Sequence, residues 1–321
     1  MTHAFRAALA ALILLALPAT ADPAPGITHL TETSRAERPL SLSVWYPSKE
    51  SASAVFGGNA AFEGVAVAPN AAPPTGPLPL VIVSHGGLRS ADDTGAWLSA
   101  SIAQMGFIVV EINTPRPNDA SAALSEIWQR PDDISRTLDS LLANPDWSRR
   151  VDRTRISAVG FALGATASLS IAGAEMNPDT YIRSCTSARP AQAPDCAWFA
   201  AQGVSLIQTS LPDLGRLKRD PRVTAVVAVN PEYTEALGTA SQGVAILRLS
   251  LGRNPLDEEP AVTIPDASAF DAFAICSARG RAILLEEEGD GSLCETPAEA
   301  RQAIHTEITG QIVTFLAEGL R

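Results

Sequence analysis

Five residues, Gly160-Phe161-Ala162-Leu163-Gly164, have the glycine spacing of a motif that supplies a nucleophile for acyl transfer. In the G-x-S-x-G motif, a serine lies on a sharp turn between a strand and a helix, which leaves its hydroxyl exposed. The third position of this sequence is alanine, whose methyl group cannot attack a carbonyl carbon. The spacing therefore predicts the turn without its nucleophile.

A second glycine-containing turn, Ser84-His85-Gly86-Gly87, follows an apolar run. In enzymes with the motif, one oxyanion-hole N–H group comes from such a turn, and the other comes from the residue after the nucleophile. We therefore expect His85, Gly86, Gly87 and Leu163 to form a site of backbone donors. We interpret His85 as part of this turn rather than as a catalytic base. The alternative is that Ser84 is a relocated nucleophile.

Buried strands that alternate with helices must position these two turns. The patterns predict strands at 39–47, 79–87, 107–113, 155–161, 223–231 and 244–252, helices at 94–106, 130–144, 163–174 and 298–320, and a long loop at 48–77. This alternation predicts one doubly wound, mostly parallel α/β sheet, in which ligands bind at the carboxyl ends of the strands. Residues 176–222 interrupt the alternation and predict a small helical excursion over that edge.

The first 21 residues predict a cleavable signal peptide. Arg6 precedes an apolar run of eleven residues, Ala7–Leu17, which is too short to span a bilayer. Ala19 and Ala21 then form the small-residue pattern that precedes a cleavage site, which we expect before Asp22. The protein is therefore expected in the periplasm or outside the cell.

The mature chain, residues 22–321, is expected to form a single α/β domain. The full sequence of 321 residues has a net charge of −11 and no cluster of basic residues, which argues against a nucleic-acid partner. No later segment is long and apolar enough to predict a membrane span in the mature chain. The sequence has no C-x-x-C motif and no Cys/His cluster, so we expect no bound metal. We expect no other cofactor either.

Four cysteines fit an exported protein, because disulfides persist in oxidising compartments. Three pairings are possible in principle. We favour Cys185 with Cys196 and Cys276 with Cys294, because each pair closes a short loop that contains proline, glycine or serine. Each bridge is expected to contribute about 3 kcal/mol by restricting the unfolded chain.

Three segments carry a family resemblance when they are taken together and in order. These are "LPLVIVSHGG", "RPDDISRTLDSLL" and "VDRTRISAVGFALGATASLSIAGAE". They resemble the dienelactone-hydrolase and platelet-activating-factor-acetylhydrolase-like branch of the α/β-hydrolases. The resemblance covers most of residues 35–320. It implies an α/β-hydrolase fold and a Ser–Asp–His ester or lactone hydrolase.

The catalytic positions that this resemblance implies are not occupied as catalysis requires. The nucleophile position is Ala162, and the base position, within "DASAFDAFAIC", is Ala269. Asp257, in "GRNPLDEEP" after the last predicted strand, is the possible acid. The next histidine, His305, lies in the terminal helix, where the family carries a histidine without catalytic use.

The paired loss predicts an inactive or very weak enzyme, because a serine nucleophile depends on an adjacent base. We therefore expect a pseudoenzyme that binds a small acyl or apolar ligand, or a protein partner. One alternative is an active carboxylic-ester hydrolase with rearranged residues, either Ser84 with His85 or a water activated by Asp257. The other is a structural or interaction protein whose pocket is filled.

Overall fold

The structure, a computed structural model, describes residues 22–88, 90–186, 195–215, 217–252, 261–287 and 289–319. The predicted leader lies outside these residues. The strands are β1 (Gly26–Glu32), β2 (Leu40–Tyr46), β3 (Ala54–Phe56), β4 (Val65–Pro69), β5 (Leu78–Ser84), β6 (Ile108–Asn113), β7 (Val151–Phe161), β8 (Ala225–Val229), β9 (Ala245–Leu251) and β10 (Ala261–Ile264). The α-helices are α1 (Ala96–Gln104), α2 (Ala120–Ala123), α3 (Glu126–Ala143), α4 (Leu163–Ile171), α5 (Pro178–Arg183), α6 (Asp195–Ala201), α7 (Leu211–Leu214), α8 (Gly280–Glu287) and α9 (Ala298–Gly319).

One ten-stranded sheet runs through the molecule in the order β10-β9-β8-β7-β5-β6-β2-β1-β4-β3. The six strands from β10 to β6 are all parallel. β2 is antiparallel to β6, and β1 is antiparallel to β2. The expected mostly parallel, doubly wound α/β sheet is therefore confirmed. Its parallel core brings the ends of β5 and β7 next to each other.

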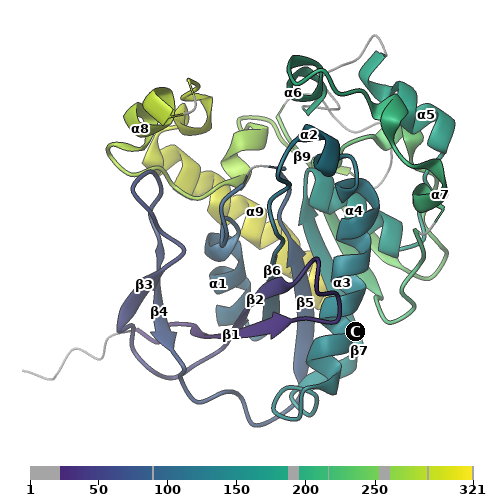
Figure 1. The fold of residues 1–321 in the computed structure, drawn as a ribbon. Coiled ribbons are helices and arrows are strands. Elements are labelled where there is room, and N and C mark those ends of the chain that lie inside the picture. Colours follow the sequence, from purple (N-terminus) through teal and green to yellow (C-terminus); the bar gives the residue numbers. More distant parts are fainter. Residues whose placement is uncertain are drawn as a thin grey trace, which may run out of the picture.

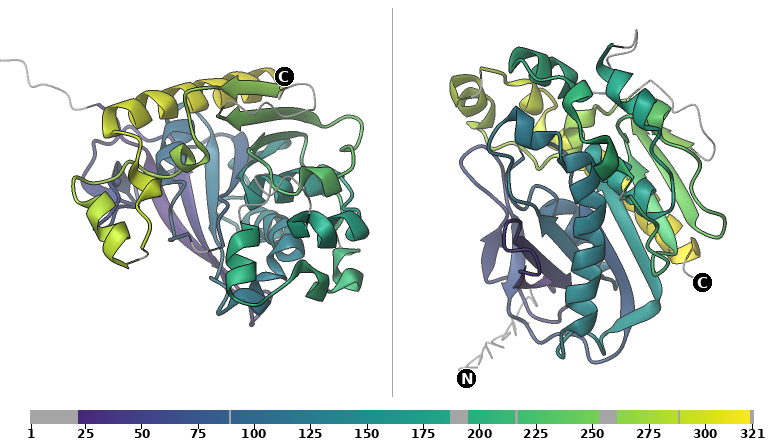
Figure 2. Two further views of the ribbon diagram at one scale, coloured as in Figure 1. Left: turned by 90° about the horizontal axis from the view of Figure 1, so that it is seen from above. Right: turned by 45° about the vertical axis from the view of Figure 1, so that its right-hand side comes forward.

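Helices cover both faces of this sheet, as parallel strands require. Helices α3 and α4 bury apolar side chains against one face, and α1 and α9 bury theirs against the other. Figure 2 shows this from above, with α9 in yellow along one side of the sheet. The two layers explain why the central strands read as continuous apolar runs. None of the helices in the described ranges is long and apolar enough to span a bilayer.

The excursion between β7 and β8 is helical where the structure describes it. Helices α5, α6 and α7 lie together beside the upper end of the sheet (Figure 1). Tyr181, Phe199 and Leu206 bury their side chains in the same core as α3 and α4. The disulfide Cys185–Cys196 links α6 to the segment after α5.

The predicted loop at 48–77 is partly wrong, because it contains β3 and β4. These strands are short, β3 is mostly exposed, and β4 joins the sheet by pairing with β1. Strands β1 and β10 were also absent from the sequence prediction. Helix α3 begins at Glu126, before the predicted start at 130, and continues through Pro131.

Candidate functional site

The turn after β7 has the backbone geometry of a nucleophile elbow. Ala162 has φ +50° and ψ −120°, a conformation that is rare and costly for a residue with a side chain. Its N–H donates to Val229 O at 2.9 Å, and its carbonyl accepts the N–H groups of Ala165 at 2.9 Å and Thr166 at 3.1 Å. The neighbouring strand and the first turn of α4 thus hold this strained residue in place. Its side chain is a methyl group.

Glycines allow the turns after β5 and β7 to come into direct contact. A Cβ atom on Gly164 would lie 1.9 Å from Ser84 O, and one on Gly160 would lie 2.1 Å from Gly164 O. A Cβ atom on Gly86 would lie 2.1 Å from Phe161 O. Real Cβ atoms do not approach other atoms so closely, so these positions require glycine. The structure therefore brings the two predicted turns together.

Side-chain donors hold the carbonyl groups of the turn after β5. Arg130 donates to His85 O at 2.7 Å and to Gly87 O at 3.3 Å, while Ser90 Oγ donates to Gly86 O at 2.9 Å. In a trans peptide the N–H group points opposite to the carbonyl. The N–H group of each of these peptide units therefore points away from the side chain, Arg130 or Ser90, that bonds its carbonyl. Arg130, whose role the sequence analysis did not identify, therefore helps to fix the orientation of two peptide units in this turn, while the donor site itself stays a prediction.

A buried ion-pair network fixes Arg130. Its Nε donates to Glu126 Oε2 at 3.0 Å, one helical turn earlier on α3. Arg38 bonds the other oxygen of Glu126 at 2.7 Å and also contacts Asp133 at 2.8 Å. Buried charges are stable only when paired and hydrogen-bonded in this way. The segment "RPDDIS" contains Arg130 and Asp133 of this network, but the partners of Arg130 are visible only in the folded structure.

His85 is not arranged as a base for a hydroxyl group. Its Nδ1 lies 2.8 Å from Gly86 O, and its Nε2 lies 3.1 Å from Ala272 O. Both ring nitrogens therefore face backbone carbonyls. The ring stacks on Phe161 with centroids 5.2 Å apart, and Phe273 meets it edge-on at 4.9 Å. Burial lowers the pKa of His85, which favours the neutral ring.

The predicted base position, Ala269, lies in a segment whose backbone carbonyl groups are hydrogen-bonded by side chains from other elements. Ala269 is exposed and begins the short 3-10 helix η5 (Ala269–Ala272). Trp97 Nε1 donates to Ala272 O at 3.0 Å, and His305 Nε2 lies 2.9 Å from Asp271 O. The contacts of His85 with this segment are made by Ala272 O and the ring of Phe273, and none in the described structure is made by Ala269. The possible acid, Asp257, lies outside the described residues.

Glu232, which follows β8, is a buried carboxyl group that the sequence analysis did not single out. Its backbone N–H and carbonyl both bond Thr166 Oγ1, at 2.9 and 2.7 Å, which ties it to the elbow helix. Its Oε2 atom has no hydrogen-bond partner in the described structure. Burial, followed by the charge of Asp195, raises the pKa of Glu232, while Arg130 opposes the rise. Burial therefore favours the protonated form of this carboxyl group relative to an exposed glutamate.

A second buried carboxyl group, Glu111 on β6, supports the start of α1. Its Oε1 accepts the N–H of Gly95 at 2.7 Å, and its Oε2 accepts the hydroxyl of Ser99 at 3.1 Å. Burial, followed by the nearby charge of Asp93, raises the pKa of Glu111 to about 8. The same end of the sheet has an open groove of about 850 Å³, which Phe56 and Asp92 help to line. Ala162 is not among the residues that line it.

Both predicted disulfides are present, with Cys185 bonded to Cys196 and Cys276 bonded to Cys294. The second bridge lies beside Arg301, which donates to Cys276 Sγ at 3.5 Å. Arg301 is fully buried and also bonds Asp271 at 3.0 Å. This bridge therefore helps to hold the segment that contains Ala269.

The comparison with solved structures finds 371 matching chains. One is a ferulic acid esterase from Streptomyces cinnamoneus, with a TM-score of 0.56 and 15% sequence identity over 95% of this chain and 92% of that chain. No family model and no curated protein matches the sequence. At this identity the likeness concerns the fold, and one fold supports many different functions. The strand order, the turn after β7 and this likeness together show that the protein has the α/β-hydrolase fold.

Proposed function

We propose that this protein is an exported pseudoenzyme of the α/β-hydrolase fold, which acts by binding rather than by hydrolysing esters. The observation that carries the proposal is the methyl group of Ala162 on a strained elbow that is otherwise complete. A serine hydrolase needs a nucleophile and a base within hydrogen-bond reach of each other. The esterase neighbour supports an ester-hydrolase scaffold, and the missing groups distinguish this chain from an active one.

The surroundings of the elbow support the same conclusion. The ring nitrogens of His85 face backbone carbonyls, and Nε2 of His305 does so as well. Neither imidazole has a hydroxyl group among its described hydrogen bonds. The retained turn and its Arg130 support are consistent with a scaffold that once held an oxyanion. The ligand of the pseudoenzyme is proposed to be a small apolar or acyl molecule.

Export is part of the proposal. It is supported by the charge, length and small residues of the first 21 residues, and by two disulfides, which fit an oxidising compartment. A second candidate function is an interaction protein whose old active site is filled. Phe273 favours it, because its ring contacts His85 and would lie 3.9 Å from a Cβ atom on Gly87.

Covalent labelling tests the proposal. The purified protein is incubated with a fluorophosphonate, which reacts with activated serines, and its intact mass is measured. We expect no adduct on the wild-type protein. Ser84→Ala serves as a matched variant, since Ser84 is the relocated nucleophile of the alternative hypothesis. An adduct on the wild-type protein that disappears in Ser84→Ala would establish a rearranged active site and overturn the pseudoenzyme proposal.

A further inference from the structure

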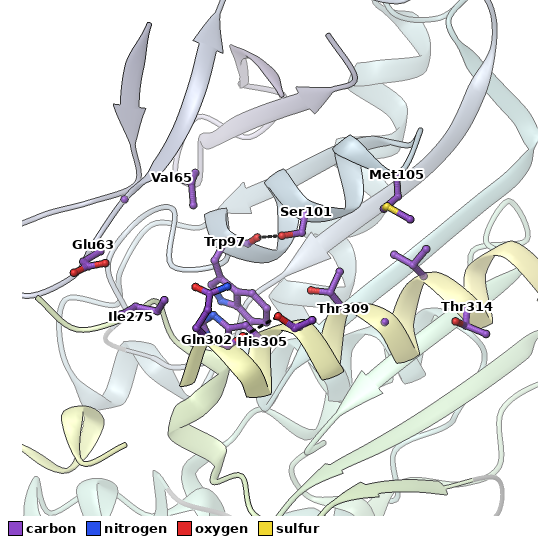
Figure 3. Close-up of a pocket in the computed structure, with 14 residues that line it drawn as sticks. Glu63, Val65, Trp97, Ser101, Met105, Ile275, Gln302, His305, Thr309 and Thr314 are labelled. Atoms are coloured by element: carbon purple, nitrogen blue, oxygen red, sulfur yellow. Dashed lines mark hydrogen bonds between the residues drawn. The ribbon is translucent and has the colours of Figure 1, made fainter. Parts of the chain in front are cut away.

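A separate groove lies between α1 and α9, on the face of the sheet opposite α3 and α4 (Figure 3). Its volume is about 530 Å³, and the chain just before and at the start of β4, Glu63 to Val65, closes one side. This volume falls within the range of small-molecule sites, roughly 300–1,000 Å³. The groove is distinct from the elbow, since Ala162 does not line it.

Small side chains on α9 keep the groove open. Thr306, Thr309 and Gly310 line it on α9, Ser101 lines it on α1, and Met105 lines it directly after α1. A Cβ atom added to Gly310 would meet no other atom within 4 Å, so unfilled space begins directly at the backbone of this helix. A glycine in the middle of a long helix costs stability relative to alanine, by about 1 kcal/mol. Local helix stability therefore does not explain the residue, and its exposed position leaves the groove unobstructed there.

The walls of the groove offer mainly hydrocarbon. Ser101 Oγ donates to Trp97 O at 2.7 Å, and Thr306 Oγ1 donates to Gln302 O at 2.9 Å. These hydroxyl groups bond back to their own helices, as is common for serine and threonine inside helices. Among the described residues that line the groove, Glu63 is the one acidic side chain, and no lysine or arginine is present. Such a lining favours an uncharged molecule.

Two stacked aromatic rings, those of Trp97 and His305, form part of the groove lining. Trp97 and His305 stack with ring centroids 3.6 Å apart and planes 9° apart. Nε2 of His305 lies 2.9 Å from Asp271 O and 3.0 Å from Phe273 O, and carbonyls only accept, so Nε2 carries the hydrogen. Burial lowers the pKa of His305 to about 4, so the ring is neutral at pH 7. The lone pair therefore lies on Nδ1.

We propose that the groove between α1 and α9 binds an uncharged, mainly apolar small molecule that donates one hydrogen bond to Nδ1 of His305. The inference rests on the binding role proposed above and gives that role a place and a ligand chemistry. The ligand lies against the small residues of α9 and reaches the Trp97–His305 stack with its donor. The elbow, which Phe273 helps to cover, is then part of the scaffold and not the ligand site.

Two probes that share the naphthalene ring test this assignment in calorimetric titrations at pH 7. 2-Naphthol is uncharged, apolar and carries one hydroxyl donor, whereas 2-methoxynaphthalene lacks the donor. We expect saturable one-to-one binding of 2-naphthol to the wild-type protein. The methyl ether should bind about fivefold more weakly, the factor that one neutral hydrogen bond provides. Absence of saturable 2-naphthol binding, or equal affinities for the two probes, would overturn the inference.

A matched pair of glycine variants tests the location. Gly310→Leu fills the groove, whereas Gly76→Leu adds the same side chain at another position where a Cβ atom meets nothing within 4 Å. We expect Gly310→Leu to weaken 2-naphthol binding at least about tenfold and Gly76→Leu to leave it unchanged. Equal binding by both variants would place the ligand elsewhere. These titrations are independent of ester hydrolysis, so a negative result here leaves the pseudoenzyme proposal standing.

Discussion

Glu111 is expected to make the protein less stable as the pH rises. The folded protein holds this carboxyl group in a buried position with a pKa of about 8, whereas the ordinary value is 4.5. Because the folded-state pKa lies above the unfolded one, the folded protein binds the proton more tightly between these two pH values. The free energy of unfolding therefore falls as the pH rises from 4.5 to about 8.

The size of this effect follows from the two pKa values. Their difference is about 3.5, and each pH unit corresponds to about 1.4 kcal/mol, so Glu111 accounts for a loss of about 5 kcal/mol across the range. Glu111→Gln removes the titration but keeps the shape. Its amide oxygen can still accept the N–H of Gly95, as Oε1 of Glu111 does.

Urea unfolding at pH 5 and pH 9, followed by tryptophan fluorescence, measures the effect. Glu111→Gln should gain several kcal/mol relative to the wild-type protein between pH 5 and pH 9. Glu307→Gln, an exposed position on α9, serves as the control and should follow the wild-type protein at both pH values. If the difference between Glu111→Gln and the wild-type protein is the same at pH 5 and pH 9, Glu111 does not titrate as the structure indicates.

Three further changes should each lower the free energy of unfolding in urea. Gly86→Ala places a Cβ atom 2.1 Å from a backbone carbonyl oxygen and should cost about 1–3 kcal/mol, and wild-type stability would refute the close contact between the two turns. Arg130→Met leaves Glu126 with one fewer buried partner and should cost about 3–5 kcal/mol, whereas unchanged stability would mean that this ion pair is not formed. Replacing Cys276 and Cys294 by serine opens a loop with a sequence separation of 18 and should cost about 3 kcal/mol, unless the thiols are unpaired in the native protein.

The core of the fold was predictable because its signals are local. Strands β5, β6, β7, β8 and β9 are buried on both faces, which produces apolar runs that the sequence displays directly. The elbow was predictable for a related reason. Gly160 and Gly164 are required by close backbone contacts, so their spacing survives although the nucleophile is absent. The disulfide pairing was also predictable, because each pair of cysteines closes a short loop.

Other features depend on contacts that no local pattern records. Strands β3 and β4 are short and exist through their pairing with each other and with β1. Glu111 lies within a predicted strand and Glu232 directly follows another, but their raised pKa values follow mainly from burial in the fold, which the sequence does not show. The contact of Phe273 with His85 likewise joins residues almost two hundred positions apart. Residue type and spacing cannot predict such encounters.

Hydrolysis of short p-nitrophenyl esters tests the central claim most directly. Initial rates are measured for the wild-type protein and for Ala162→Ser, against buffer, at pH 7. The account predicts rates equal to buffer for the wild-type protein, which has no nucleophile at the elbow. It predicts the same for Ala162→Ser, because the described hydrogen bonds place the imidazoles of His85 and His305 on backbone carbonyls. Turnover by the wild-type protein that a fluorophosphonate abolishes would contradict the proposal that this protein does not hydrolyse esters.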